Sequence, residues 1–153
     1  MTAKERLLHD IETFDIEMFY CPLKNNSAIS AADGYIGLNP ALRAEPTVLT
    51  TVLCHEMGHF HAGAFYYGYS PFELRSQAEY RADKACTLRY VPYDEMIDLM
   101  RQGIETRCEL AEAFGVTEEL IEKSYNYYKD VELTLEQISG LKTMLDYYRY
   151  LTY

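Results

Sequence analysis

The chain has 153 residues, 48% of them hydrophobic and 25% charged, which is typical of one globular domain over residues 1–153 with a single core. Its 14 basic and 24 acidic residues give a formal net charge of −10, which disfavours direct binding to nucleic acid or to an anionic membrane, because phosphate binding needs clustered Lys and Arg. A basic protein partner would instead be steered toward such a surface.

No apolar run approaches the length of a membrane span, and the first six residues lack the apolar stretch of a secretory signal. These features predict a cytoplasmic protein. The four cysteines are scattered without metal-type pairing, so we expect no disulfides. Cys54 and Cys86 lie among apolar or helical residues and are expected to be small buried hydrophobic residues.

The N-terminal part predicts a helix followed by a short strand. Hydrophobic residues at helical spacing predict a helix over residues 3–19, with a break before Pro22. The segment 24–33 is polar and turn-like. The run Tyr35–Leu38 that follows it has the composition of a strand.

The pattern His55-Glu56-x-x-His59 is the most informative stretch, and it lies in a segment with helical punctuation. Pro46 suits a first helical turn and Gly63 a C-terminal stop. Residues four apart on a helix share one face, so His55 and His59 can offer two imidazole nitrogens to one metal ion. The alternative is a chance match with packed histidines. Flanking apolar residues at helical spacing favour the metal site: Val48, Leu49, Val52, Leu53, Met57 and Phe60.

Glu56 then lies beside the metal, near its open coordination position. Zinc lowers the pKa of a bound water toward about 7, and a neighbouring carboxylate can take the water's proton as the water attacks a carbonyl. The motif therefore predicts a hydrolase with one Zn²⁺ ion and Glu56 as its general base, and it favours a peptidase.

A catalytic zinc ion takes three protein ligands, so a third ligand is needed. The segment Ser70–Glu73 has the form of a capping box and predicts a helix that runs from about residue 71 toward Pro92. Within it, Glu79 and Asp83 share a face, so one could bind the metal while the other orients a ligand imidazole. Without the upstream motif, a solvated acidic pair would be the better interpretation. With the motif, Glu79 is the best candidate.

Two other candidates for the third ligand are weaker. His61 is too close in sequence to His59 to reach the same metal from one helix face. Glu73 is better explained as part of a helix cap.

Three segments in this order resemble the ImmA/IrrE-type metallopeptidases, in which a short strand ending in Asn-Pro precedes the His-Glu-x-x-His helix and a second helix with a ligand Glu that closes with Pro. The match covers roughly residues 30–92 and continues more weakly to about 125. The matching segments are Gly34-Tyr35-Ile36-Gly37-Leu38-Asn39-Pro40-Ala41-Leu42, His55-Glu56-Met57-Gly58-His59 and Glu79-x-x-Ala82-Asp83-x-x-Cys86-x-x-x-Tyr90-Val91-Pro92.

The resemblance implies an α+β fold, a mainly helical, zincin-like domain with a short β-sheet beside the motif helix. It implies a gluzincin-like site in which His55, His59 and Glu79 bind zinc, Glu56 is the general base and Asp83 is a carboxylate that supports a ligand. In peptidases with this helix motif, an edge strand beside the zinc often pairs with the extended substrate backbone.

The resemblance also implies regulatory proteolysis, in which the enzyme cleaves a protein such as a helix-turn-helix repressor of a phage or mobile element. The competing hypothesis is a non-catalytic zinc-binding protein that inactivates a regulator by binding it. The sequence departs from the family pattern at Arg89 and Tyr90, which stand in a usually aliphatic run. This departure concerns local packing more than the ligand set.

Residues of about 30–92 are thus expected to form the catalytic core, and 93–153 a C-terminal helical part. Helical patterns cover about 93–102, 104–114, 118–129 and 135–150. Natural stops and N-caps separate them: Gly103, Gly115, Thr117 and Thr134.

The rhythm of residues 111–121 is typical of a helix-turn-helix, but three glutamates give the would-be recognition helix a negative charge: Glu118, Glu119 and Glu122. This disfavours a DNA reader. A helical hairpin packed on the catalytic core, or a substrate-docking element, fits better.

Fifteen tyrosines are present, and the cluster at Tyr66, Tyr67 and Tyr69 directly follows the motif helix. This loop is expected near the zinc, where it could line the cleft. One of its tyrosines could donate a hydrogen bond to a transition-state oxyanion, and the sequence favours none of the three.

Overall fold

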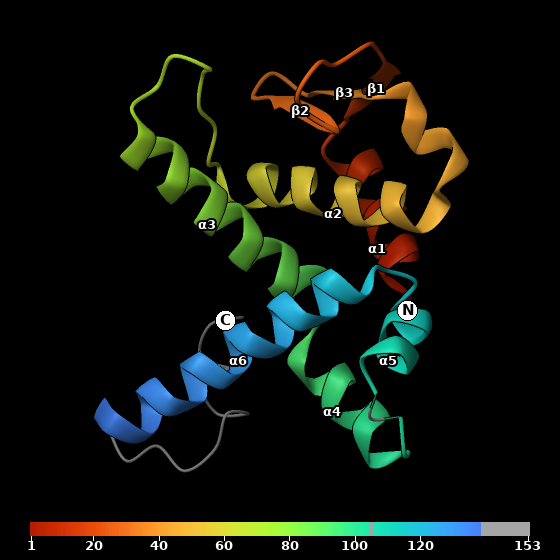
Figure 1. Ribbon diagram of the computed structural model, residues 1–153, viewed down its shortest axis with the longest axis vertical. Coiled ribbons are helices and arrows are strands. Elements are labelled where there is room, and N and C mark those ends of the chain that lie inside the picture. Colours follow the sequence, from red (N-terminus) through yellow and green to blue (C-terminus); the bar gives the residue numbers. More distant parts are fainter. Residues whose placement is uncertain (105, 139–153) are drawn as a thin grey trace.

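The computed structural model describes the backbone of residues 1–104 and 106–138, and the side chains of these residues up to 132. Over these residues the fold is α+β and mostly helical, as predicted, with six α-helices, one 3-10 helix and a small three-stranded sheet (Figure 1). The α-helices are α1 (Ala3–Thr13), α2 (Pro46–Ala62), α3 (Phe72–Tyr90), α4 (Tyr93–Arg101), α5 (Arg107–Phe114) and α6 (Glu118–Ile138). The strands are β1 (Glu17–Tyr20), β2 (Ala28–Ala31) and β3 (Tyr35–Leu38), and the 3-10 helix η1 covers Pro40–Ala44.

The sheet has the strand order β1-β3-β2, with β1 parallel and β2 antiparallel to the central strand β3. It lies along one side of α2 (Figure 1). Ile36 and Leu38 of β3 are buried in the same apolar core as Leu53 and Met57 of α2. Burial of these side chains against the motif helix fixes which face of the sheet points inward, because successive strand residues point to opposite faces.

Two expectations for the N-terminal part were wrong. The helix predicted over residues 3–19 ends at Thr13, and β1 replaces its last turn. Asp15, with φ of 53°, reverses the chain in the left-handed region that Asp tolerates better than most residues. The turn-like segment 24–33 contains β2. Both short strands pair with β3, and sequence periodicity does not reveal such a long-range partner.

The motif helix α2 begins and ends as predicted, with Pro46 in its first turn and Gly63 at its end in the left-handed conformation, φ 58°. Helix α3 also covers the expected region, but the predicted capping box is wrong. Pro71 occupies the N-cap position, and no side chain caps the helix. The Ser70 hydroxyl instead accepts a hydrogen bond from the backbone N–H of Tyr67, 3.0 Å away, within the preceding loop.

Arg89 and Tyr90, near the end of α3, share one partner in α1. Both side chains donate hydrogen bonds to Asp10 of α1, from Arg89 Nε at 2.9 Å and Nη2 at 2.7 Å and from the Tyr90 hydroxyl at 2.8 Å. His61 of α2 also contacts this carboxylate at 3.0 Å. This group of four residues, here called the Asp10 cluster, ties α1 to the two central helices.

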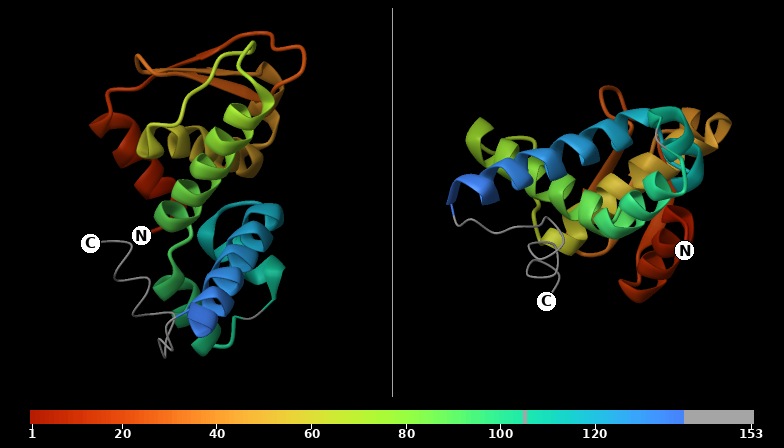
Figure 2. Two further views of the ribbon diagram at one scale, coloured as in Figure 1. Left: turned by 90° about the vertical axis from the view of Figure 1, so that its left-hand side faces the viewer. Right: turned by 90° about the horizontal axis from the view of Figure 1, so that it is seen from below.

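The C-terminal part packs on the core through α6, which crosses α3 (Figure 2). Buried hydroxyls of Thr87 and Ser124 lie 3.2 Å apart, and the Tyr128 hydroxyl donates to the Val91 carbonyl at 2.8 Å. The backbone N–H of Thr117 donates to the Thr51 hydroxyl of α2 at 2.9 Å. The helical hairpin of α5 and α6 is thus docked on the helices that carry the motifs.

Helix α4 agrees with the predicted segment, whereas α5 begins at Arg107, after the predicted start at about 104, with Thr106 as its N-cap. The Thr117 hydroxyl accepts from the Leu120 N–H, as expected of an N-cap. The break predicted before Thr134 is wrong, because α6 continues to Ile138. Most of the helix predicted over 135–150 lies outside the described residues. The division into a catalytic core and a helical part stays a prediction.

Two further expectations concern the buried cysteines and the apolar character of the helices. Cys54 and Cys86 are both buried, as expected. Of the helices in the described part of the chain, none combines the length and the apolar character needed to cross a membrane.

Candidate metal centre

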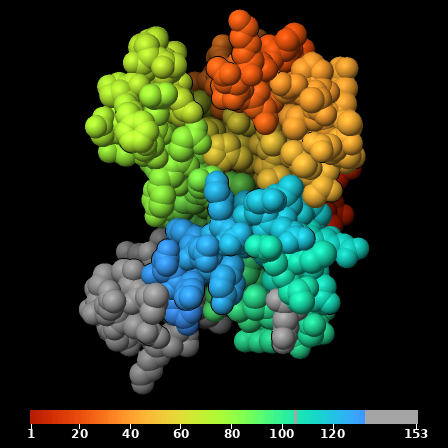
Figure 3. Space-filling view, viewed as in Figure 1, coloured from red at the N-terminus to blue at the C-terminus, as the bar shows by residue number. Residues whose placement is uncertain are grey.

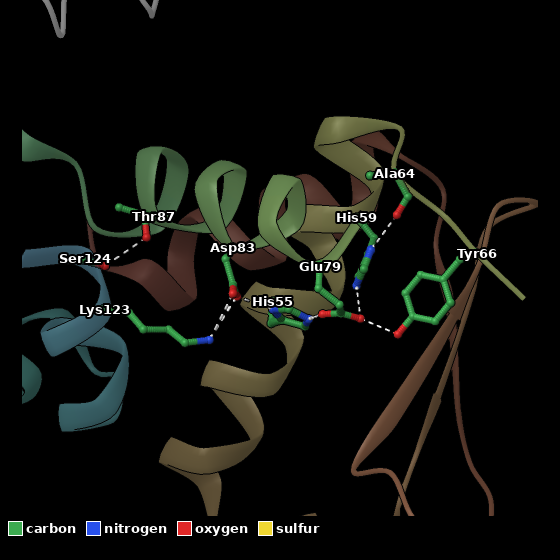
Figure 4. Close-up of polar contacts among 9 residues, drawn as sticks. All are labelled: His55, His59, Ala64, Tyr66, Glu79, Asp83, Thr87, Lys123 and Ser124. Atoms are coloured by element: carbon green, nitrogen blue, oxygen red, sulfur yellow. Dashed lines mark hydrogen bonds and ion pairs between the residues drawn. The ribbon is translucent and has the colours of Figure 1, made fainter. Parts of the chain in front are cut away.

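Two helices bring the predicted ligands together. His55 and His59 lie one turn apart on α2 and face Glu79 of α3 (Figure 4). His55 Nε2 is 2.9 Å from Glu79 Oε2, and His59 Nε2 is 3.6 Å from Glu79 Oε1. One nitrogen or oxygen from each of the three residues lies within 4.8 Å of the others, so the group could hold a metal ion. We call it the His-His-Glu group.

Each imidazole is oriented through its other nitrogen. His59 Nδ1 is 2.6 Å from the carbonyl oxygen of Ala64, which can only accept, so Nδ1 carries the hydrogen and donates. His55 Nδ1 is 2.9 Å from Asp83 Oδ1, where an ionised carboxylate likewise requires a donor. Each imidazole therefore directs its Nε2 toward Glu79, and that nitrogen is the one that would bind a metal ion.

Gly58, the fourth residue of the motif, explains how the two helices approach so closely. A Cβ atom added at Gly58 would lie 2.3 Å from the carbonyl oxygen of Ala82 in α3, which no side chain tolerates. Ala82 itself is fully buried. The absence of a side chain at Gly58 thus lets α3 pack directly on the motif helix, between the positions of Glu79 and Asp83.

The electrostatics of the group favour positive charge. Burial disfavours charged His55, but hydrogen bonds with Asp83 and Glu79 outweigh it and raise the pKa of His55 to about 10. Hydrogen bonds from His55 and His59 hold the pKa of Glu79 well below its usual range. The carboxylates of Glu79 and Asp83 are thus ionised, and their negative charge beside the imidazoles would favour a bound cation.

Glu56 lies on α2 between the two histidines in sequence, and its side chain is buried. It lines the same cleft as the His-His-Glu group. The cleft has a volume of about 540 Å³ and is formed by β2, α2, α3, the loop after α2 and the start of α6. In Figure 3 the surface is hollowed between the orange segment that contains β2, the green segment that contains α3 and the blue α6.

Tyr66, in the loop after α2, also reaches the group, because its hydroxyl donates a hydrogen bond to Glu79 Oε1. This contact with Glu79 raises the pKa of Tyr66 to about 12, so the phenol keeps its hydrogen at neutral pH.

Sequence reasoning missed Lys123. This side chain of α6 donates to Asp83 Oδ1 at 3.2 Å and to Oδ2 at 3.1 Å, and so holds the carboxylate that contacts His55. No local signal could have revealed it, since the two residues are 40 positions apart and meet only when α6 packs across α3.

The two weaker ligand candidates lie away from the group. His61 belongs to the Asp10 cluster, and its Nε2 lies 3.0 Å from Asp10 Oδ2 and 3.2 Å from the Tyr90 hydroxyl. Glu73 is exposed in the first turn of α3, although it caps no backbone group. The prediction that Glu79, rather than His61 or Glu73, is the third ligand therefore agrees with the geometry.

The chain was compared with models of protein families, with characterised proteins and with solved structures, and no match was found. What the described residues establish is therefore an α+β protein with a His-His-Glu group that could hold a metal ion.

Proposed function

We propose that the chain is a zinc-dependent endopeptidase of the ImmA/IrrE type. The observation that carries the proposal is the His-His-Glu group, with ligand atoms within 4.8 Å of one another, in a cleft that Glu56 also lines. An acid–base carboxylate beside a set of metal ligands is the arrangement that metal-assisted hydrolysis requires.

The donor set fits zinc. Two imidazole nitrogens and one carboxylate oxygen are ligands that zinc binds in hydrolases with a fourth position left open. The contacts from Asp83 and Ala64 keep both imidazoles in the tautomer that coordinates through Nε2. When bound, zinc supplies an acidified water and polarises the carbonyl of the scissile bond.

Glu56 is the general base in this proposal. Its carboxylate accepts a proton from the attacking water and later delivers it to the leaving nitrogen, as the new C–O bond forms and the C–N bond breaks. Its side chain is buried and lines the same cleft as the His-His-Glu group, which suits this role.

A protein substrate is supported by β2. This strand forms one edge of the sheet in the described part of the chain, and its residues Ala28, Ile29 and Ser30 line the cleft. Unpaired backbone groups on such an edge can pair with an extended peptide. The net charge of −10 suits a basic substrate. A helix-turn-helix repressor, the substrate class suggested by the family resemblance, would have that character.

Replacing Glu56 by Gln tests the proposal. The variant should still bind zinc, since Glu56 is not among the proposed ligands, and should lose cleavage of a candidate repressor by more than about 100-fold. Cleavage followed by mass spectrometry, with zinc content measured on the same samples, gives the answer. Full activity of the variant with zinc bound would refute catalysis by Glu56. Inactivation of the repressor without cleavage by either protein would support the non-catalytic alternative.

A further inference from the structure

Three tyrosines of the loop after α2 differ sharply in their surroundings. Tyr67 and Tyr69 are 68% and 85% exposed and stack on each other with ring centroids 5.3 Å apart. Tyr66 is 39% exposed and lines the cleft with its hydroxyl on Glu79. Of the three, Tyr66 is the one that contacts the His-His-Glu group.

The position of Tyr66 is fixed by its neighbours. The backbone N–H of Ala64 donates to the His59 carbonyl at 3.0 Å, while its own carbonyl accepts from His59 Nδ1 at 2.6 Å. The Phe65 ring packs edge-on against Phe60 at 5.0 Å between centroids. One neighbour is thus bonded to a proposed ligand and the other is anchored on α2, which places the partly exposed Tyr66 at the cleft with its hydroxyl on Glu79.

The hydroxyl of Tyr66 lies on the opposite side of the group from Lys123 (Figure 4). Both side chains end in hydrogen-bond donors that line the cleft. Lys123, however, donates to both oxygens of Asp83 and is committed to that carboxylate. Tyr66 donates to one oxygen of Glu79, a proposed ligand that also lines the cleft, so its hydroxyl lies beside the place where a substrate carbonyl would meet the metal.

We propose that Tyr66 is a catalytic residue, whose hydroxyl donates a hydrogen bond to the carbonyl oxygen of the scissile bond as negative charge develops there. The inference rests on the proposed peptidase function. A neutral donor suits this task, because it stabilises a developing oxyanion without first attracting the charge of the proposed ligands. The proton stays on Tyr66 throughout, and Glu56 carries the proton that is transferred.

The test compares Tyr66→Phe with the matched control Tyr67→Phe, each of which removes one hydroxyl and keeps the ring. Zinc affinity is measured by competition with a chelator. Binding of acetohydroxamate to the zinc-loaded proteins is then measured by calorimetry, because its anionic oxygen stands in for the oxyanion and no natural substrate is needed. Tyr66→Phe should weaken acetohydroxamate binding about tenfold, as expected for loss of one hydrogen bond to a charged group, and leave zinc affinity within about twofold. Tyr67→Phe should change neither.

The outcomes separate the two proposals. If the unaltered protein binds no zinc, the peptidase function fails and the role of Tyr66 with it. If it binds zinc but Tyr66→Phe binds acetohydroxamate as tightly as Tyr67→Phe does, the role of Tyr66 alone is overturned. A loss of zinc affinity in Tyr66→Phe that accounts for the whole effect also overturns it, because Tyr66 would then only position Glu79.

Discussion

The two central helices carry two carboxylate clusters of similar design and different outcome. In each, a carboxylate contacts histidine of α2 and accepts a hydrogen bond from a tyrosine: Glu79 contacts His55 and His59 and accepts from Tyr66, and Asp10 contacts His61 and accepts from Tyr90. The difference is Arg89, which donates twice to Asp10 at 2.7 and 2.9 Å.

The two carboxylates also differ in how far they are exposed to solvent. The Asp10 side chain is 5% exposed, whereas that of Glu79 is 39% exposed and opens on the cleft. A guanidinium keeps its charge at any ordinary pH, so Arg89 permanently fills the cation position of the Asp10 cluster. Among the described residues, the polar contacts of Glu79 are with two imidazoles and a phenol and include no guanidinium or ammonium group, so a metal ion could take the cation position there. The comparison teaches that the built-in cation makes one cluster structural, and its absence leaves the other available for a ligand.

Removing Glu79 should have the largest effect. Glu79→Ala leaves two imidazoles, so zinc affinity should fall by more than the roughly 10–100-fold that is typical when a partner of a ligand is removed. Chelator competition and the metal content of the purified protein measure it. Glu73→Ala, an exposed residue of the same helix, should bind zinc normally. Unchanged zinc affinity in Glu79→Ala would show that Glu79 is not a ligand, and the contrast between the two clusters would fail.

Asp10→Asn tests the structural role of the Asp10 cluster. Removing this charge leaves Arg89 without its carboxylate partner, and the free energy of unfolding should fall by about 3 kcal/mol, the low end for a broken buried pair because the Arg89 side chain is 40% exposed. Chemical denaturation measures the loss. Zinc affinity of the folded variant should stay unchanged, since the cluster touches none of the proposed ligands.

The same variant has a distinct pH dependence. Burial disfavours ionised Asp10, but hydrogen bonds from Arg89 and Tyr90 outweigh it and lower the pKa of Asp10. Because the folded pKa is below the unfolded value of about 3.9, this stability is present above that value and is lost as pH falls through the folded pKa. Asp10→Asn should lack this acid-side loss. If the free energies of unfolding of the unaltered protein and of Asp10→Asn fell equally with pH below about pH 4, the lowered pKa of Asp10 would be contradicted.

Gly58→Ala tests the helix contact that both clusters share. A methyl group 2.3 Å from the Ala82 carbonyl must push α3 away, which should cost roughly 1–3 kcal/mol of stability. Zinc affinity should fall as well, because the ligands come from both helices. Gly68→Ala is the control, since an added Cβ there has no neighbour within 4 Å. Thermal unfolding and chelator competition should show both losses in Gly58→Ala alone.

The smallest effect is expected at Lys123. Lys123→Met removes the ammonium group that holds Asp83 but leaves the contact between Asp83 and His55 in place, so zinc affinity should fall only about threefold, below the range for direct partners of ligands. Lys129→Met, an exposed lysine of the same helix, should have no effect. A loss as large as that of Glu79→Ala would show that α6 is essential to the metal centre.

Local spacing was sufficient to predict most of the candidate site. His55 and His59 share a helix face by their separation, and Glu79 and Asp83 do so on the next helix, so two amphipathic patterns and one close helix contact define four positions. The same reasoning predicted β3 and most helix bounds in the described residues.

Features that depend on distant pairing could not be predicted in the same way. Strands β1 and β2 exist because β3 offers them hydrogen bonds, and Lys123 reaches Asp83 only through the docking of α6. The Asp10 cluster joins residues up to 80 positions apart. In each case the interaction energy lies in a contact between segments whose own sequence patterns carry no information about the partner.

The proposed metal ligands are confined to one helix–loop–helix segment, residues 46–90, which also lines part of the cleft, whereas the rest of the lining comes from residues in and around β2 before it and at the start of α6 after it. Contacts within such a segment join residues that are near in sequence, whereas β2 and α6 reach the cleft through contacts between more distant parts of the chain. The proposed metal ligands and part of the cleft lining thus lie in separate stretches of the chain. Substitutions in β2 and α6 can reshape the cleft over evolutionary time while the metal donors stay in place.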